Sequence, residues 1–133
     1  MIRKLRFQLL LIITILFAGK VSAQECGLNA LNDAEGQYNI GKFYESINKL
    51  NSCILAKGFT YSEKVQAYRL LSMSYLALDS VEKADESIER LLLLKDNFEA
   101  DTRDPDRFRL QVLFLRQQLR AKLTSSVSKK AES

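Results

Sequence analysis

Helical periodicity with very few interruptions is the feature of this sequence that most limits its fold. Apolar residues recur at spacings of three and four over most of the chain, whereas the alternation typical of strands is nearly absent. The chain has only five glycines and one proline, so the turn-forming residues stand out. These positions are Gly41, Lys57-Gly58, Asp79-Ser80, Lys95-Asp96-Asn97 and Asp104-Pro105. The sequence therefore predicts an all-α domain of roughly five helices.

Start and stop signals set the expected bounds of these helices. Gly58 is placed to end the second helix as a left-handed cap, and Ser62 is placed to N-cap the third. Asp104 followed by Pro105 is typical of an N-cap with proline in the first helical position. The serine- and lysine-rich residues 124–133 are expected to form a frayed or flexible tail. The expected helices are 28–39, 43–57, one that starts at Ser62 and stops before Asp79, 81–94, and 105 to about 123.

The first 23 residues have the three parts of a secretory signal peptide. A basic start leads into an apolar run from Leu9 to Ala18, and small residues follow in Val21-Ser22-Ala23. The alternative is a transmembrane anchor, but a spanning helix needs about 20 apolar residues, roughly twice the length of this run. We expect cleavage after Ala23, which leaves a helical domain over residues 24–123 and the tail over 124–133.

Removal of the signal peptide changes the charge of the chain. The net charge of +4 includes four basic residues and no acidic ones in residues 1–23, so the remainder has 16 basic and 16 acidic side chains. A nucleic-acid partner recognised through overall basicity is thereby excluded. Residues 24–100 carry 8 basic and 12 acidic side chains, whereas residues 101–133 carry 8 and 4. This asymmetry indicates either two balanced, solvated faces or a basic C-terminal helix that meets an acidic partner or a membrane surface.

Two cysteines, Cys26 and Cys53, both lie after the expected cleavage site. In an oxidising compartment such a pair in a small domain is typically bridged, so we expect a disulfide. The alternative is a buried, apolar Cys53 and a free thiol at Cys26. The chain has no histidine, and two cysteines alone make a metal site improbable, so we expect no metal and no cofactor.

Two segments of the chain repeat at an offset of 38 residues, since Gly41-Lys42-Phe43 aligns with Asp79-Ser80-Val81. This spacing is close to that of a tetratricopeptide repeat (TPR) with a short insertion near Phe59. The chain resembles the TPR family over roughly residues 27–98, with the second repeat the better match. Ser46 replaces the usual alanine in the first. The matching residues of the second repeat are Tyr68, Leu71, Ser72, Tyr75, Ala84, Ile88 and Leu91.

The chain is also similar to short exported TPR-like modules of the Bacteroidota envelope. The features that carry this resemblance are the two cysteines, Tyr68-Arg69-Leu70-Leu71 and the closing Asp104-Pro105. The resemblance implies about two helical hairpins followed by a C-terminal capping helix. It also implies a protein that is periplasmic or associated with the outer membrane.

Catalysis is not expected from this sequence. It has no histidine, no nucleophile elbow, no phosphate-binding glycine loop and no paired zinc-ligand motif. Asp85, Glu86 and Glu89 cluster on one expected helix, where they are typical of a solvated face. The sequence therefore favours a binding protein over an enzyme.

In the TPR family, the first helices of successive repeats line a concave groove that binds peptides. Transfer of the groove positions predicts Arg69 for a partner carboxylate, Asn39 for its backbone, and Tyr38 and Met73 as apolar anchors. The alternative for the apolar members is that they are core residues. The predicted groove residues are Leu31, Glu35, Tyr38, Asn39, Gln66, Arg69, Leu70 and Met73.

The last expected helix has more apolar surface than a capping helix needs. One apolar stripe, which includes Phe108, Val112 and Leu115, would cover the preceding hairpin, but Leu110, Leu113 and Phe114 lie beyond it. These three residues predict a second interface. The alternative is that the face folds back on Phe98 and the tail.

Three hypotheses follow for function. The first is an adaptor or accessory subunit that docks on another envelope protein or a peptide segment of it. The second is a structural homo-oligomer assembled through the C-terminal helix. The third is contact with a membrane surface through four arginines. These are Arg107, Arg109, Arg116 and Arg120.

Overall fold

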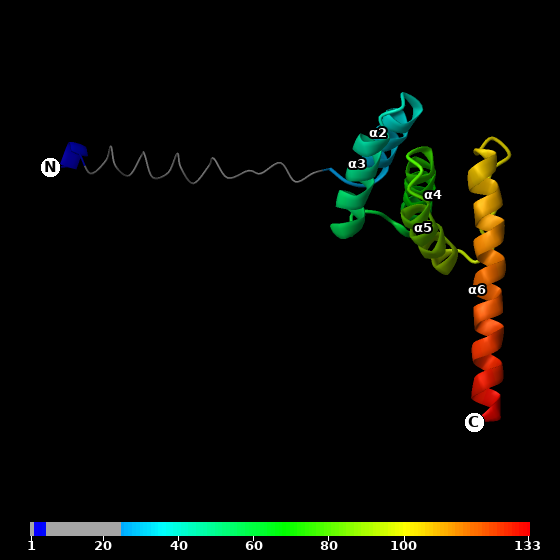
Figure 1. Cartoon of the computed structure of the whole chain (residues 1–133). Helices are drawn as coiled ribbons and strands as arrows, with labels where there is room; N and C mark the ends of the chain where they lie inside the picture. The colour runs from blue at the N-terminus through cyan, green and yellow to red at the C-terminus, as the bar shows by residue number, and fades with distance from the viewer. Residues whose placement is uncertain (1, 5–24) are drawn as a thin grey trace.

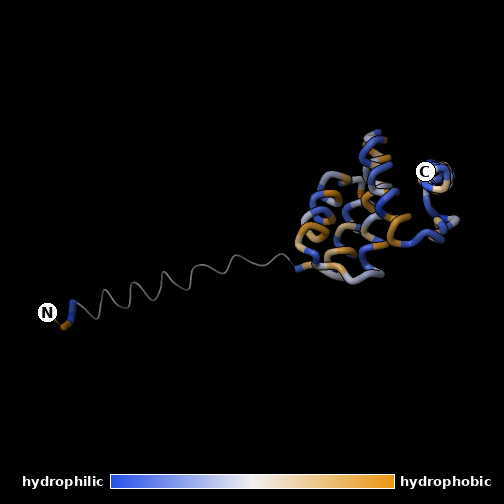
Figure 2. The backbone as a smooth tube through the Cα atoms, turned by 90° about the horizontal axis from the view of Figure 1, so that it is seen from below, coloured by the Kyte–Doolittle hydropathy of each residue, from blue (hydrophilic) through white to orange (hydrophobic). Residues whose placement is uncertain are grey.

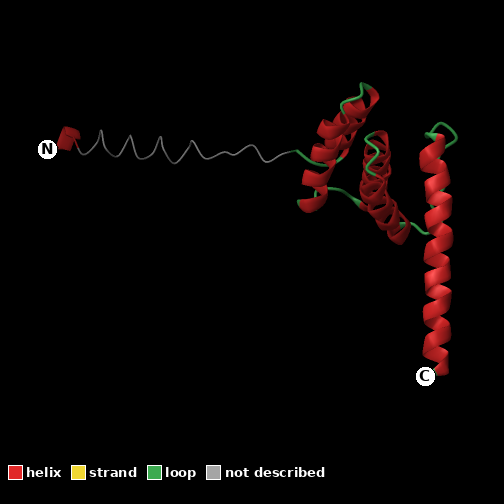
Figure 3. Ribbon diagram, in the orientation of Figure 1, coloured by secondary structure: helices red, strands yellow, loops and turns green. Residues whose placement is uncertain are grey.

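A computed structural model of the chain describes residues 2–4 and 25–133, and these contain helices and turns but no strand. The all-α prediction is therefore confirmed (Figure 3). The predicted signal peptide, apart from residues 2–4, lies outside the described residues. The helices are α2 (Leu28–Asn39), α3 (Phe43–Leu55), α4 (Tyr61–Ala77), α5 (Val81–Leu94) and α6 (Asp106–Glu132).

The helices form two antiparallel hairpins and a single last helix, side by side (Figure 1). Helices α2 and α3 form the first hairpin and α4 and α5 the second, while α4 also contacts α2 and α3. Helix α6 packs on α5 and α4, and its C-terminal part extends well beyond the hairpins. Figure 2, in which α6 is seen end-on, shows that α6 forms one edge of the molecule.

The first three helices of the domain end in the same way. The residue after each C-cap is left-handed, and it is Gly41 (φ 80°), Lys57 (φ 53°) or Asp79 (φ 56°). The next amide then donates to the carbonyl five residues earlier, at 2.8 to 2.9 Å. This Schellman pattern satisfies carbonyls that the helix end leaves open and turns the chain sharply. The predicted left-handed cap at Gly58 is wrong by one residue, since Lys57 takes that conformation.

Gly58 is required for a different reason, which is its contact with the disulfide. Cys26 and Cys53 are bonded, with their Cα atoms 5.4 Å apart, so the predicted disulfide is confirmed. A Cβ atom at Gly58 would lie 2.3 Å from the Cβ of Cys26 and 2.9 Å from its sulfur. The bridge thus holds the segment before α2 against α3 and the α3–α4 turn, and only glycine leaves room for it.

Two of the predicted helix starts are wrong. Helix α4 is capped by Thr60 rather than Ser62, because Thr60 and Glu63 form a reciprocal capping box. Helix α6 starts at Asp106, and no side chain caps it. Asp104 does not cap α6 because its carboxylate is engaged with Arg69 and with the amide of Asp101.

Two helix ends also differ from the expectation. Helix α3 stops at Leu55, before Lys57. Helix α6 continues to Glu132, so residues 124–132 are helical instead of a frayed tail. The helix can continue because no glycine or proline follows Pro105 to stop it. The Thr124 hydroxyl donates to the Arg120 carbonyl at 2.9 Å without interrupting the helix.

Several of the completely buried positions in the helices carry small side chains. Ala34, Ser46, Ala67, Ser72 and Ala84 are all completely buried. The Ser72 hydroxyl donates to a carbonyl of its own helix, so its burial leaves no unpaired donor. A larger side chain at these positions would force the helices apart.

Candidate protein-interaction surfaces

The structure divides the predicted groove residues into core and surface. Leu31, Leu70 and Met73 are only 8%, 3% and 5% exposed, so they belong to the core. Helix α4 buries its apolar side chains on several sides because it contacts all four other helices. The remaining five positions stay at least partly accessible. Glu35, Asn39 and Gln66 are exposed, and Tyr38 and Arg69 are half-buried.

Arg69 does not offer a free guanidinium to a partner carboxylate, because Asp104 already occupies it. The Arg69 Nε donates to Asp104 Oδ2 at 3.0 Å, and a second nitrogen pairs with Asp104 Oδ1. The Asp104 side chain is 2% exposed and that of Arg69 is 22%. Asp104 Oδ2 also accepts from the Asp101 amide at 2.9 Å. This ion pair ties the segment before α6 to α4, and its role is structural.

A small cleft remains where the predicted groove reaches the start of α6. It has a volume of about 310 Å³. Burial raises the pKa of the Tyr38 phenol, the Arg69 charge lowers it and the Asp104 charge raises it, so the phenol stays neutral at ordinary pH. The cleft could hold one apolar side chain but is too small for an extended peptide. Its lining residues are Tyr38, Met73, Leu76, Ala77, Asp79, Pro105, Arg107 and Phe108.

The predicted second interface lies on the surface of α6. Leu110, Leu113 and Phe114, here called the α6 outer face, are 66%, 54% and 52% exposed. On the opposite side of the helix, Phe108 and Val112 are buried. The expected alternative, a fold back on Phe98 and the tail, does not occur, since Phe98 packs edge-on against the buried Phe108 and the tail is helical.

The 38-residue repeat shows why this face is uncovered. Leu110, Leu113 and Phe114 correspond to three residues of α4, one repeat of 38 positions earlier, and to three residues of α2, two repeats earlier. The equivalents are buried or half-buried, because the next two helices cover α2 and α4. In the described residues no helix follows α6, so the same face stays open. The equivalents are Ser72, Tyr75 and Leu76 in α4, and Ala34, Gln37 and Tyr38 in α2.

The buried side of α6 follows the same repeat. Phe108 and Val112 correspond to Leu70 and Ser74 of α4, which are buried, and Ser74 approaches α3 of the preceding hairpin through Ser46 (3.5 Å). In α2 the equivalents are Asn32 and Gly36, and both are exposed. Helix α6 therefore occupies the place of the first helix of a third hairpin.

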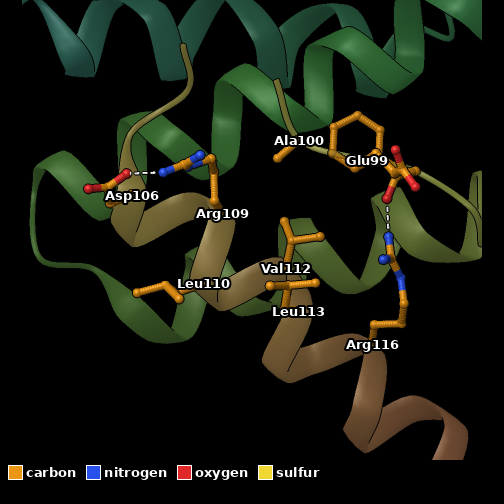
Figure 4. A pocket seen from close by; sticks show the side chains of 9 residues that line it. Glu99, Ala100, Asp106, Arg109, Leu110, Val112, Leu113 and Arg116 are labelled. Atoms are coloured by element: carbon orange, nitrogen blue, oxygen red, sulfur yellow. Dashed lines mark hydrogen bonds and ion pairs between the residues drawn. The ribbon is translucent and has the colours of Figure 1, made fainter. Parts of the chain in front are cut away.

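A groove runs between the α6 outer face and the segment before α6 (Figure 4). Its volume is about 610 Å³, and Phe98, Val112 and Leu113 are among its apolar lining residues. Arg109 and Arg116 flank it, the first paired with Asp106 and the second donating to the Phe98 carbonyl. The Nε atoms of both arginines are buried without a hydrogen-bond partner in the described chain.

A second groove, of about 560 Å³, continues along α6 on the other side of Arg116. Leu92 and Leu93 of α5 and Leu119 and Leu123 of α6 provide its apolar lining. The sequence predicts the arginines beside both grooves only as membrane contacts and does not predict the grooves themselves. The spacing of Arg109, Leu113 and Arg116 on one side of an expected helix was the available signal.

Other kinds of site lack support in the described residues. No group of three or more histidine, cysteine or carboxylate side chains is placed to hold a metal ion there. None of the helices in residues 2–4 and 25–133 has the length and apolarity that a membrane span requires. Comparisons of the chain with protein-family models, with curated proteins and with solved structures find no match.

Proposed function

We propose that this chain is an exported, non-catalytic, TPR-like adaptor or accessory subunit that docks on another protein of the cell envelope. The observation that carries the proposal is the α6 outer face. Three large apolar side chains, each more than half exposed, lie in a row where α2 and α4 have covered positions. Exposed apolar residues that gather in this way are typical of protein interfaces.

The TPR-like assignment is supported by the repeated hairpin. Two hairpins share one turn geometry, and equivalent small residues at Ser46 and Ala84 are completely buried 38 positions apart. Export is supported by the N-terminal sequence and by the disulfide, which persists in oxidising compartments. An interaction module with a rigid, cross-linked first hairpin suits that environment.

The alternative function is a structural homo-oligomer that uses the same face. This alternative rests on the exposure of the α6 outer face, which a second copy of the chain can also cover. Against it, α6 carries seven basic and two acidic residues, so two copies of α6 placed together would repel each other.

Site-specific photo-crosslinking in the native cells tests the proposal. A photoreactive residue at Leu113 should join the chain to one envelope protein, identified by mass spectrometry. The matched control is Leu55, which is 83% exposed on α3, a helix that does not contact α6. Crosslinks only between copies of this chain would favour the homo-oligomer, and no crosslink specific to Leu113 would refute docking through this face.

The N-terminus of the purified protein tests the export part separately. Export with cleavage predicts that the protein starts at Gln24. An intact Met1 would show that the signal peptide is not removed.

A further inference from the structure

The α6 outer face lies where the second helix of a hairpin would pack. In the two complete hairpins, α3 covers α2 and α5 covers α4. Helix α6 repeats the position of α4, with the equivalent residues buried on the side of the preceding hairpin. The occupant that fits its outer face is therefore an α-helix seated as the second helix of a third hairpin.

Helices α3 and α5 show what such an occupant must present. Each has a small residue, then a large apolar residue four positions later, then a third buried residue three positions after that. All six of these side chains are completely buried. This spacing forms one face of a helix, and the small residue allows close approach of the two axes. The residues are Ser46, Leu50 and Cys53 in α3, and Ala84, Ile88 and Leu91 in α5.

The charge of α6 determines what surrounds that apolar face. Helix α6 has seven basic and two acidic residues, and one of the acids, Asp106, is already paired with Arg109. Arg120 has no ion-pair partner in the described chain, and Arg116 binds only a backbone carbonyl. Besides Asp106, one more acidic residue lines the groove, and this is Glu99 in the segment before α6. Carboxylates on an incoming helix would find three guanidinium groups along one flank, of which Arg116 and Arg120 have no carboxylate partner in the described chain, whereas a second copy of α6 would add like charge.

We propose that the α6 outer face binds an acidic amphipathic helix of another protein, which completes a third hairpin. Its apolar residues contact Leu110, Leu113 and Phe114, and its carboxylates meet Arg109, Arg116 and Arg120. This inference rests on the proposed function and specifies the partner.

Binding of synthetic helices to the purified protein tests the inference by fluorescence anisotropy. The acidic probe has the sequence of α5 with Lys83 and Arg90 replaced by glutamate, so it keeps the buried triplet of a second helix. The basic control keeps the apolar residues and carries lysine in place of every acid. The acidic probe should bind about tenfold more tightly or better, and the difference should shrink as salt is added.

Substitutions in the protein identify the site at which the probe binds. Leu113→Asp should weaken binding of the acidic probe by roughly tenfold or more, because it puts a charge in the centre of the contact. Leu55→Asp, the matched control on α3, should leave binding unchanged. Arg120→Glu should reduce the preference for the acidic probe over the basic control. Circular dichroism checks that each variant is folded, as expected for side chains that are already exposed.

Three results would overturn the inference. They are equal binding of both probes, acidic-probe binding that survives Leu113→Asp, and binding of phosphatidylglycerol vesicles, lost in Leu113→Asp, in place of either probe. The crosslinking experiment tests the proposed function independently of these three results. A Leu113 crosslink to an envelope protein without any preference for the acidic probe leaves docking intact and refutes only the acidic helix.

Discussion

Removal of the disulfide should cost this domain a large part of its stability. The bridge joins Cys26, which precedes α2, to Cys53, which is completely buried in α3. Cys26→Ser breaks the bridge at its more accessible end and leaves Cys53 in the core as a thiol. The variant therefore reports the cross-link with little change in packing.

The size of the effect follows from the loop that the bridge closes. The two cysteines are 27 positions apart, and in the chain-entropy model closing such a loop in the unfolded state contributes about 3.5 kcal/mol at 25 °C. A small domain has about 5 to 15 kcal/mol of stability in total. For a domain of this length, the melting temperature should fall on the order of 15 °C.

Urea denaturation followed by far-UV circular dichroism measures this loss. The variant should unfold at lower urea, and its m-value should be higher because the unfolded chain is no longer held compact. Reduced wild-type protein is the control and should match Cys26→Ser. A loss below about 1 kcal/mol in both samples would refute the chain-entropy reasoning.

Three further predictions concern single contacts. Gly58→Ala should destabilise the oxidised protein by about 1 to 3 kcal/mol, because its Cβ would overlap the disulfide, and the cost should be smaller in the reduced protein. Asp104→Ala should cost about 2 to 3 kcal/mol in urea denaturation, since it leaves the half-buried Arg69 unpaired, whereas an unchanged midpoint would contradict a structural role. Hydrogen bonds from Arg103 lower the pKa of Asp101 from 3.8 to about 2, so any stabilisation is complete above pH 4 and is lost as the pH falls toward 2. NMR titration should show this low pKa, and Arg103→Ala should raise it only part of the way to 3.8, because the backbone amide of residue 103 still donates to the carboxylate.

Local signals in the sequence determined most of the secondary structure. Apolar spacing placed α2 and α5 at their observed bounds, and the turn residues separated the hairpins. These features depend on contacts within a few residues, and such contacts are readable from a sequence. The predicted frayed tail over residues 124–133 is wrong because serine-rich composition does not by itself end a helix, and no glycine or proline follows Pro105 to interrupt α6.

Partners distant in the sequence decided the roles of individual side chains. Asp104 before Pro105 has the pattern of a cap, yet its carboxylate binds Arg69, 35 positions away. Leu70 and Met73 have the same spacing whether they line a groove or a core. They are core residues because α4 lies in the middle of the fold, with α2, α3, α5 and α6 around it.

The excess of apolar residues on the last helix was visible in the sequence alone, because apolar periodicity belongs to the helix itself. Only the tertiary structure showed that Leu110, Leu113 and Phe114 lie on the side that no described helix covers. Periodicity reveals which face of a helix is apolar, whereas the neighbours that cover or expose that face come from packing between distant segments.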